Sequence, residues 1–158
     1  MSPRAAWRLE AAGFDPVYDY AAGKADWLAA DLPFHGEAQL VGQVTRRHVP
    51  TVPGEASTAQ ALEQLDTFGF GPVLVLNAAS VVLGTLHREQ LEAAPADAPV
   101  DRLLHFGVST VRPSEQVADL THRMHHANVT RVVVTRQDGT LVGLFFTEDQ
   151  QAVDDSST

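Results

Sequence analysis

The apolar and polar positions of the chain follow the same pattern twice. Residues 73–76 form a short apolar run, which passes through a small or polar gap into a second run at residues 81–86. The same arrangement returns 59 positions later, in the apolar runs of residues 131–135 and 141–145. Short runs of this kind, separated by a turn, predict paired strands. A repeat of this length predicts two supersecondary units that pack on each other and leave a cleft between them.

A helix is expected before each pair of strands. In the first copy, Ser57 or Thr58 caps a helix that runs to about Phe68, and in the second copy Ser114 caps the equivalent helix. Apolar side chains that recur at helical spacing give each helix one buried side. These stripes consist of Leu62, Leu65 and Phe68 in the first copy and of Val117, Leu120, Met124 and Ala127 in the second.

Each repeat is completed by an extended segment before its first helix and by a helix start after its last strand. The extended segments are residues 49–53 and 109–113, and the helix starts lie at Arg88 and Thr147. The order within each unit is therefore β-α-β-β-α. Because the strands are apolar on both faces, each sheet is expected to be covered by helices. The predicted fold class is α+β, with α/β-like repeats.

The chain divides into four parts. The repeats, at residues 40–95 and 99–153, are expected to pack pseudo-symmetrically through their sheets, because a unit of roughly 50 residues is rarely stable alone. Residues 1–36 predict an N-terminal helix-strand-helix extension with too few large apolar residues for its own core. Residues 154–158 are polar and are expected to be disordered. Within the extension, the helices are predicted at residues 3–12 and 24–32 and the strand at residues 16–20.

Composition and charge narrow the classes of function. The 158 residues are 44% hydrophobic, which suits one domain or two small halves that share a core. The formal net charge is -9, which argues against nonspecific binding to nucleic acid or to an anionic membrane. No cysteine is present, so disulfides, thiolate catalysis and cysteine-bound zinc are excluded. No apolar run is long enough to span a bilayer and no signal sequence opens the chain, so a cytoplasmic protein is expected.

Six short segments of the repeats carry a family resemblance. They are Thr51-Val52-Pro53, Pro72-Val73-Leu74-Val75 and Leu83-Gly84-Thr85-Leu86 in copy one, and residues 110–113, 131–134 and 142–149 in copy two. Together they resemble a tandem pair of CBS domains (named for cystathionine β-synthase), often called a Bateman module. The resemblance implies a non-catalytic regulatory module that forms a homodimer and requires no cofactor. Its implied ligand is an adenine nucleotide or related adenosyl compound, such as AMP, ADP, ATP or S-adenosylmethionine.

The N-terminal extension is similar to the C-terminal end of a rhodanese domain, through residues 13–20 and 23–28. A whole rhodanese domain is much longer, and its nucleophilic cysteine precedes the helix that starts here at Pro3. Because the chain has no cysteine, it cannot carry out persulfide chemistry. The extension is therefore interpreted as a remnant or a truncated start of such a domain.

The resemblance also implies where a ligand would bind. In CBS pairs, a threonine after the last strand lies near phosphate, and an aspartate three residues later binds ribose hydroxyls. Asp149 holds the aspartate position of copy two, whereas Phe146 holds the threonine position and Thr147 comes one residue late. In copy one, His87 and Gln90 hold these two positions. The segment at Asp149 also fits a helix-capping box, so capping is the alternative role. A bound ligand is expected to favour the Asp149 side.

Five more residues are implied as ligand contacts. Arg131 precedes the central strand of copy two and can pair with phosphate, or it is a solvated charge at a strand edge. Thr51 and Thr110 lie where the family contacts ligand through loop backbone, although turn chemistry also explains them. Pro72 and Val132 would line an adenine pocket, where an apolar strand residue is expected in any case.

Three histidines, His122, His125 and His126, lie close together on the second predicted helix. Because no carboxylate accompanies them, a solvated, pH-sensitive face explains them better than a metal site, and no metal is predicted. Three hypotheses for the function follow. The first is a regulatory module that binds an adenosyl ligand between the repeats, and the second is a dimerisation or interaction scaffold with an empty cleft. The third is a fragment of a rhodanese–CBS sulfurtransferase.

Overall fold

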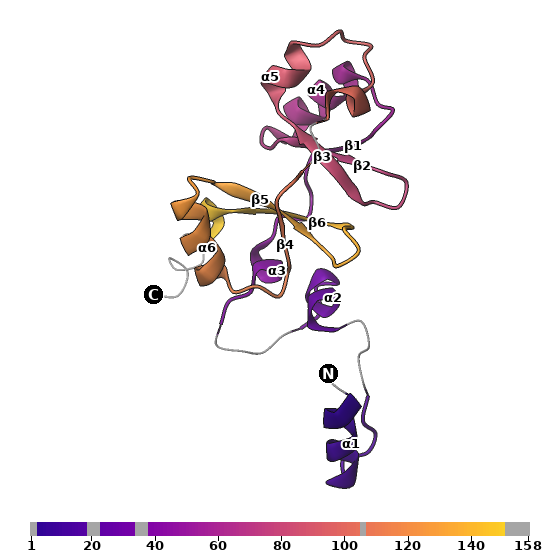
Figure 1. Ribbon diagram of the computed structural model, residues 1–158, viewed down its shortest axis with the longest axis vertical. Coiled ribbons are helices and arrows are strands. Elements are labelled where there is room, and N and C mark those ends of the chain that lie inside the picture. The colour runs from indigo at the N-terminus through magenta and orange to yellow at the C-terminus, as the bar shows by residue number, and fades with distance from the viewer. Residues whose placement is uncertain (1–2, 19–22, 34–37, 105–106, 151–158) are drawn as a thin grey trace.

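The computed structural model describes residues 3–18, 23–33, 38–104 and 107–150. It contains two similar lobes, each a small sheet with helices on one side, and an N-terminal extension (Figure 1). The first lobe is formed by β1 (Thr51–Pro53), α4 (Thr58–Phe68), β2 (Val73–Leu76), β3 (Val82–Leu86) and α5 (Arg88–Glu92). The second is formed by β4 (Thr110–Val111), α6 (Val117–His126), β5 (Arg131–Thr135), β6 (Leu141–Phe146) and the 3₁₀ turn η2 (Thr147–Gln150). The remaining elements are α1 (Pro3–Ala11), α2 (Gly23–Ala29), α3 (Val41–Val44) and the 3₁₀ turn η1 (Val100–Leu103).

The two sheets share one topology. In the first lobe β1 pairs with β2 in parallel and β2 pairs with β3 antiparallel, and β4, β5 and β6 repeat this order in the second. Helices α4 and α6 are the crossovers that each parallel pair of strands requires. The predicted α+β class, with one small sheet in each repeat, is confirmed. After β6 the described chain continues as the 3₁₀ turn η2, where an α-helix start was predicted.

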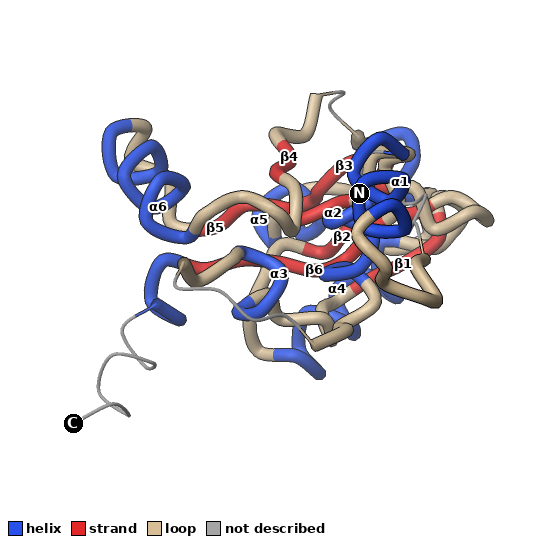
Figure 2. The backbone as a smooth tube through the Cα atoms, turned by 90° about the horizontal axis from the view of Figure 1, so that it is seen from below, coloured by secondary structure: helices blue, strands red, loops and turns tan. Residues whose placement is uncertain are grey.

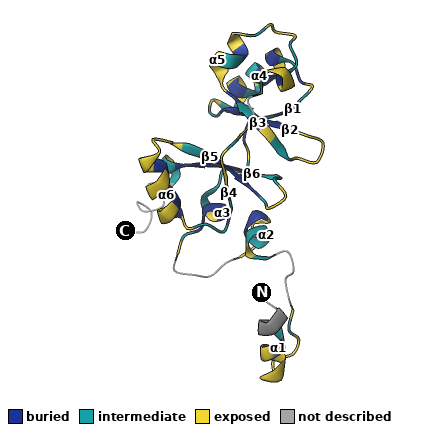
Figure 3. Ribbon diagram, in the orientation of Figure 1, coloured by how far each residue is buried: buried dark blue, intermediate teal, exposed yellow. Residues whose placement is uncertain are grey.

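The sheets pack against each other through apolar side chains. In β2, Val73 and Val75 belong to the core beneath the helices of the first lobe, whereas Leu74 belongs to a cluster between the two sheets. In β5, Val134 and Val133 divide in the same way. Successive side chains of a strand face opposite sides, so each apolar run serves two cores. The strands of both lobes lie in the middle of the molecule (Figure 2), where burial is concentrated (Figure 3).

Helix α4 has the ends that its sequence predicts. The hydroxyl of Ser57 accepts a hydrogen bond from the Gln60 N–H, and the Gln60 side chain accepts one from the Ser57 N–H. This reciprocal pair satisfies two N–H groups that the first turn would otherwise leave without partners. Gly69 ends the helix in the left-handed conformation, with φ of 70°, which glycine adopts at little cost.

Helix α6 differs from its prediction at both ends. It begins at Val117, so the expectation that Ser114 caps it is wrong. The Val117 N–H donates instead to the carbonyl oxygen of Gln39, 3.0 Å away, which belongs to a segment far upstream in the chain. At the other end, Ala127 is exposed and lies outside the buried stripe. The stripe itself is confirmed for Val117, Leu120 and Met124, which are all buried.

The short helical segment before the first strand of each lobe packs on the other lobe. The Val41 N–H of α3 donates to the carbonyl oxygen of Glu115 in the second lobe, and the Val100 N–H of η1 donates to that of Ala56 in the first, both at 2.9 Å. Val41 and Val100 are fully buried in the cores of those lobes. The hydrophobic pattern predicts neither element, because four residues are too few to show a helical stripe.

The strand predicted at residues 16–20 is wrong for residues 16–18, which are not in a strand, and residues 19–20 lie outside the described residues. Phe14 is 62% exposed and Tyr18 is 79% exposed. Among the described residues, the alternating apolar and polar positions of this segment therefore do not form part of a sheet. Val17 is half-buried, but the other described residues of the segment are exposed.

Helix α2 is attached to the second lobe, whereas α1 lies at the far end of the molecule (Figure 1). Leu28 and Ala29 of α2 are buried, and the Arg47 guanidinium donates to both of their carbonyl oxygens at 2.9 and 2.6 Å. A cation at the C-terminal end of a helix satisfies carbonyls that the helix itself leaves unpaired. No helix among the described residues has the length and apolar character needed to cross a bilayer.

Candidate functional site

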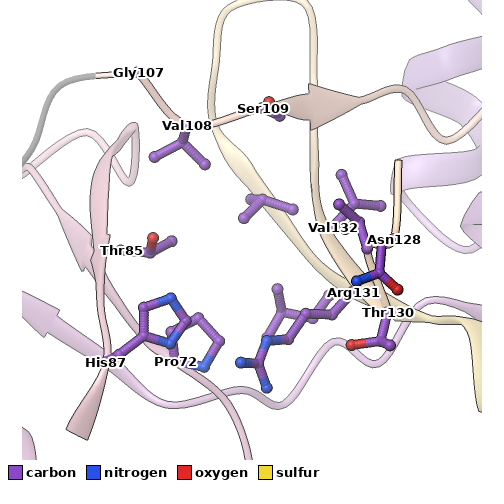
Figure 4. Close-up of a pocket in the computed structure, with 13 residues that line it drawn as sticks. Pro72, Thr85, His87, Gly107, Val108, Ser109, Asn128, Thr130, Arg131 and Val132 are labelled. Atoms are coloured by element: carbon purple, nitrogen blue, oxygen red, sulfur yellow. The ribbon is translucent and has the colours of Figure 1, made fainter. Parts of the chain in front are cut away.

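A pocket of about 420 Å³ lies between the two lobes, beside the first residues of β2 and β5 (Figure 4). It is called the Arg131 pocket below. The first lobe contributes the start of β2 and the end of β3, and the second contributes the approach to β4 and the turn between α6 and β5. The residues that bear on its chemistry are Pro72, Thr85, His87, Ser109, Asn128, Arg131 and Val132.

Arg131 brings the positive charge of this pocket. Its side chain extends from the first position of β5 across the pocket toward His87 (Figure 4). Among the described residues the Arg131 guanidinium has no hydrogen-bond or ion-pair partner. All of its N–H donors are therefore available to an anionic ligand, and a guanidinium can hold phosphate through two parallel hydrogen bonds.

The rest of the lining combines an apolar wall with a few polar groups. Pro72 is buried and Val132 is half-buried, and both border the pocket. Thr85, Ser109 and Asn128 add two hydroxyls and an amide. A concave apolar surface with a small number of placed polar groups is typical of small-molecule sites. Pro72 and Arg131, which lie 59 positions apart, thus occupy equivalent places on the two lobes.

His87 and Gln90 are engaged with each other at the start of α5. His87 is exposed at the edge of the Arg131 pocket and holds the N-cap position of the helix. The side-chain oxygen of Gln90 accepts a hydrogen bond from the His87 N–H at 2.9 Å. Gln90 does not line the pocket, since its oxygen faces the cap.

A second pocket, of about 450 Å³, lies at the equivalent place on the other side of the cleft and is called the Phe146 pocket. Phe70 and Phe146 line it, with ring centroids 5.8 Å apart in an edge-to-face arrangement. Thr147 lines it too, and the Thr147 N–H donates to the carbonyl oxygen of Thr130 at 3.0 Å. Arg131 borders both pockets, so one guanidinium lies between them.

Asp149 is paired with Arg46 beside the Phe146 pocket. The Arg46 Nε donates to Asp149 Oδ2 at 2.7 Å, and the Arg46 Nη2 donates to Oδ1 of the same carboxylate. Nη2 also donates to Glu148 Oε1, 3.3 Å away. The guanidinium carbon lies 4.5 Å from the ring centroid of Phe146 and 5.3 Å from that of Phe70. The hydrogen bond to Asp149 and the nearby negative charges raise the pKa of Arg46 above its ordinary value.

Thr51 and Thr110 lie away from both of these pockets. Thr51, in β1, borders a separate hollow on the outer side of the first lobe, together with Glu55 and Gln60. Thr110, in β4, is exposed. Neither side chain is brought together with Arg131 or Asp149. Of the residues singled out from the sequence, the Arg131 pocket gathers Pro72, His87, Arg131 and Val132, and the Phe146 pocket gathers Arg131 and Thr147.

Several residues of the site are not apparent from the sequence. Arg46 pairs with a carboxylate 103 positions away, and no local motif marks it. Thr85, Ser109 and Asn128 stand in turns or at strand ends, where polar residues are common for reasons unrelated to a ligand. The one available signal was the 59-residue spacing, which makes Asn128 the counterpart of Gly69 in the first repeat.

The histidines on α6 do not form a metal centre with other described residues. The rings of His122 and His126 are in contact, with centroids 4.5 Å apart, and both side chains are exposed. Within residues 3–18, 23–33, 38–104 and 107–150, no group of three or more histidine, aspartate or glutamate side chains is placed to hold a metal ion.

No protein-family model matches the chain, and no curated protein matches its sequence. Solved structures do match its fold. AcuB of Vibrio cholerae, named for acetoin utilization, aligns with a TM-score of 0.67 and 18% identity over 75% of this chain and 92% of that one. The CBS domains of a transcriptional regulator from Streptococcus pneumoniae align with a TM-score of 0.65 and 18% identity, over 72% of this chain and 98% of that one. The chain therefore has the fold of a tandem CBS-domain pair.

One further match was solved with bound ligands. The CBS-domain pair of protein MJ0100, in complex with 5′-methylthioadenosine and S-adenosyl-L-methionine, aligns with a TM-score of 0.63 and 16% identity, over 77% of this chain and 99% of that one. At this level of identity the likeness concerns the fold, and the ligands are those of that protein.

Proposed function

We propose that the chain is a non-catalytic regulatory module that binds an adenine nucleotide or a related adenosyl compound in the Arg131 pocket. The observation that carries the proposal is the Arg131 guanidinium, which has no partner among the described residues and lies at the edge of an apolar pocket between two CBS repeats. The pocket volume of about 420 Å³ lies in the range of sites for small organic ligands. The ligand-bound pair of similar fold supports the class of compound proposed.

Each part of such a ligand has a counterpart in the pocket. The base would lie against Pro72 and Val132, whose side chains offer an apolar wall. Phosphate, where present, would receive hydrogen bonds from Arg131. Ribose hydroxyls would contact the polar groups of Thr85, Ser109 or Asn128, which can both donate and accept.

From the sequence alone, a ligand is expected to bind on the Asp149 side of the cleft. The contacts that Asp149 makes in the structure favour ligand binding on the other side. Its carboxylate is already hydrogen-bonded to Arg46 through both oxygens. A ribose could reach Asp149 only by giving up that charge-assisted pair, which costs more than an ordinary hydrogen bond. We therefore assign the first ligand to the Arg131 pocket, with Thr147 and Asp149 on the opposite side of the cleft.

Calorimetric titration with AMP, ADP, ATP and S-adenosylmethionine tests the proposal. One site per chain is expected with at least one of these compounds. Ser109→Trp would fill the pocket and abolish the heat, whereas Thr110→Trp would preserve it, because Ser109 lines the pocket and Thr110 does not. Asp149→Ala should leave the first site intact. Absence of heat with all four compounds, or equal effects of the two tryptophans, would remove the proposal.

A scaffold without a ligand is the second candidate, and the Arg46 pair is the observation that favours it. With Asp149 and both phenyl rings in contact with Arg46, the carboxylate that would bind ribose is already paired within the chain. On this alternative a homodimer would form and would not respond to nucleotides. Sedimentation of the protein with and without AMP, ADP, ATP and S-adenosylmethionine distinguishes the two candidates.

A further inference from the structure

The Arg131 pocket differs in charge from the chain as a whole. The sequence has 20 acidic and 11 basic residues and a formal net charge of -9. Among the described residues that line this pocket, none is acidic, and the two that can carry a charge are Arg131 and His87. The Phe146 pocket, in contrast, has Glu148 in its lining. An anion that approaches this acidic chain would therefore meet a more favourable potential in the Arg131 pocket.

His87 lies across the pocket from Arg131, on the other lobe. The Arg131 side chain extends from the start of β5 toward the His87 ring, which follows the last residue of β3 (Figure 4). Both side chains line the same pocket, so one ligand can contact them together. A ligand held by both would bridge the two lobes.

The contacts of His87 fix its backbone and leave its ring available. The His87 N–H donates to the side-chain oxygen of Gln90 at 2.9 Å, which holds the residue at the N-cap position of α5. Among the described residues, the imidazole nitrogens have no hydrogen-bond or ion-pair partner. The ring can therefore donate to a ligand without giving up a contact within the chain.

The charged groups near His87 come from three elements. Arg131 of β5 lies across the pocket, and Arg88 and Glu89 follow His87 on α5. The Arg88 guanidinium pairs with Asp66 of α4 at 2.5 Å. Histidine changes its charge between about pH 5 and 8, whereas arginine, aspartate and glutamate usually keep theirs in that range. Among these groups, His87 is therefore the one through which pH can act on the charge of the pocket.

We infer that His87 and Arg131 together hold two phosphates of one ligand, so that His87 selects an adenosine di- or triphosphate for this pocket. The inference rests on the proposed function and names the class of ligand for the same pocket. Arg131 can hold one phosphate through two hydrogen bonds, and a protonated His87 adds a charged donor for the next. AMP has no second phosphate to place there. S-adenosylmethionine carries a sulfonium, which both cations repel and which no described lining residue can neutralise.

The test is the calorimetric affinity for ATP, AMP and S-adenosylmethionine at about pH 8 and pH 6. The wild type should bind ATP most tightly and S-adenosylmethionine most weakly. Because protonation of His87 adds a cation, the ratio of ATP affinities between the wild type and His87→Gln should grow about 3- to 10-fold as the pH falls. The terminal phosphate of ATP also takes up a proton near pH 6, but this affects both proteins alike.

A second variant separates the charge of His87 from its shape. His87→Lys keeps a cation throughout this pH range, so it should match the wild type at the lower pH and bind ATP more tightly than the wild type at the higher pH. His125→Gln is the control, because His125 is an exposed histidine of α6. It should follow the wild type at both pH values.

The outcomes separate this inference from the proposed function. A ratio between the wild type and His87→Gln that does not change with pH would overturn the inference. AMP or S-adenosylmethionine bound by the wild type as tightly as ATP would also overturn it, and would leave the proposed function in place. If His87→Gln does not fold, a ratio between His87→Lys and the wild type that is constant with pH has the same meaning. No binding of any of the three compounds would overturn both.

Discussion

Val41 and Val100 lie 59 positions apart in the sequence, each ahead of the first strand of one lobe, and each is fully buried in the core of the other lobe. Their N–H groups make equivalent hydrogen bonds, to Glu115 and to Ala56, across the boundary between the lobes. The core of each lobe is therefore completed by the segment that precedes the first strand of the other lobe. This exchange explains how two short repeats, each too small to bury a full core alone, form one stable unit.

Val41→Ala and Val100→Ala should each lower the free energy of unfolding by about 2 kcal/mol, from the lost apolar contact and the cavity that remains. Chemical denaturation should show a single transition in both variants, and amide exchange should report loss of protection in both lobes. Val129→Ala, at a residue 41% exposed, is the control and should change stability by less than about 0.5 kcal/mol. Two separate transitions would show that the lobes unfold independently.

Gly143 and Gly84 are equivalent residues with different tolerance of a side chain. A Cβ at Gly143 would meet the backbone of Arg46, whereas a Cβ at Gly84 would meet the end of the Leu104 side chain, at 2.5 Å. The Leu104 side chain can rotate away, but the Arg46 backbone is held by its bridge to Leu144. Gly143→Ala should thus cost about 3 kcal/mol and Gly84→Ala clearly less. Equal losses in thermal unfolding would contradict this account.

Asp138 makes the stability of a hairpin turn depend on pH. The Thr140 N–H and hydroxyl donate to Asp138 Oδ1 at 2.9 and 2.7 Å, and these bonds lower the pKa of Asp138 below its ordinary value of 3.8. A lowered pKa gives stabilisation that is complete above the ordinary value and is lost as the pH falls through the folded value. The carboxylate should therefore stabilise the turn at neutral pH and lose this effect in acid.

Asp138→Asn is the matched variant, since its side chain can still accept a hydrogen bond but carries no charge. The wild type should have the higher melting temperature at neutral pH, and the difference should shrink as the pH falls below about 4. The turn is coupled to the other lobe, because Gly139 accepts a hydrogen bond from the Val82 N–H at 3.2 Å. A difference in melting temperature that is constant with pH would contradict this role of the charge.

Arg131→Gln separates the contribution of the phosphate to ligand affinity from that of the rest of the ligand. Loss of a charged donor to phosphate should weaken the binding of AMP or ATP roughly 10- to 100-fold, whereas adenosine should lose little affinity. Arg123→Gln, on the exposed face of α6, is the control and should leave the affinities of all three compounds unchanged. An equal loss for adenosine and ATP would mean that Arg131 acts on the shape of the pocket and not on phosphate.

Much of the fold follows from local patterns in the sequence. The alternation at Val73, Leu74 and Val75 requires two buried faces, and Ser57 with Gln60 is a capping signal that needs no tertiary context. The same kind of pattern was misleading at residues 16–18, because alternation predicts a strand only where another strand is available to pair with it.

The site was less accessible to prediction because its decisive contacts are long-range. The resemblance to CBS pairs implies that Arg131 faces the cleft, and Arg131 does lie beside a pocket there. Arg46 belongs to the segment before β1 and reaches the edge of β6 in the other lobe through its bridge to Leu144. Its pairing with Asp149 depends on that long-range contact. Only the folded chain brings these two residues together, and their pairing engages both carboxylate oxygens of Asp149.

The position of the ligand is the central claim, and chemical-shift mapping of the amide groups tests it most directly. Titration of the ¹⁵N-labelled wild-type protein with the compound that gives calorimetric heat should shift the amides of residues 107–109, 128–133, Thr85 and His87, which border the Arg131 pocket. Residues 69–71 and 147–148, which border the Phe146 pocket, should move much less. Shifts concentrated at residues 69–71 and 147–148, or no shifts with any adenosyl compound, would contradict the account.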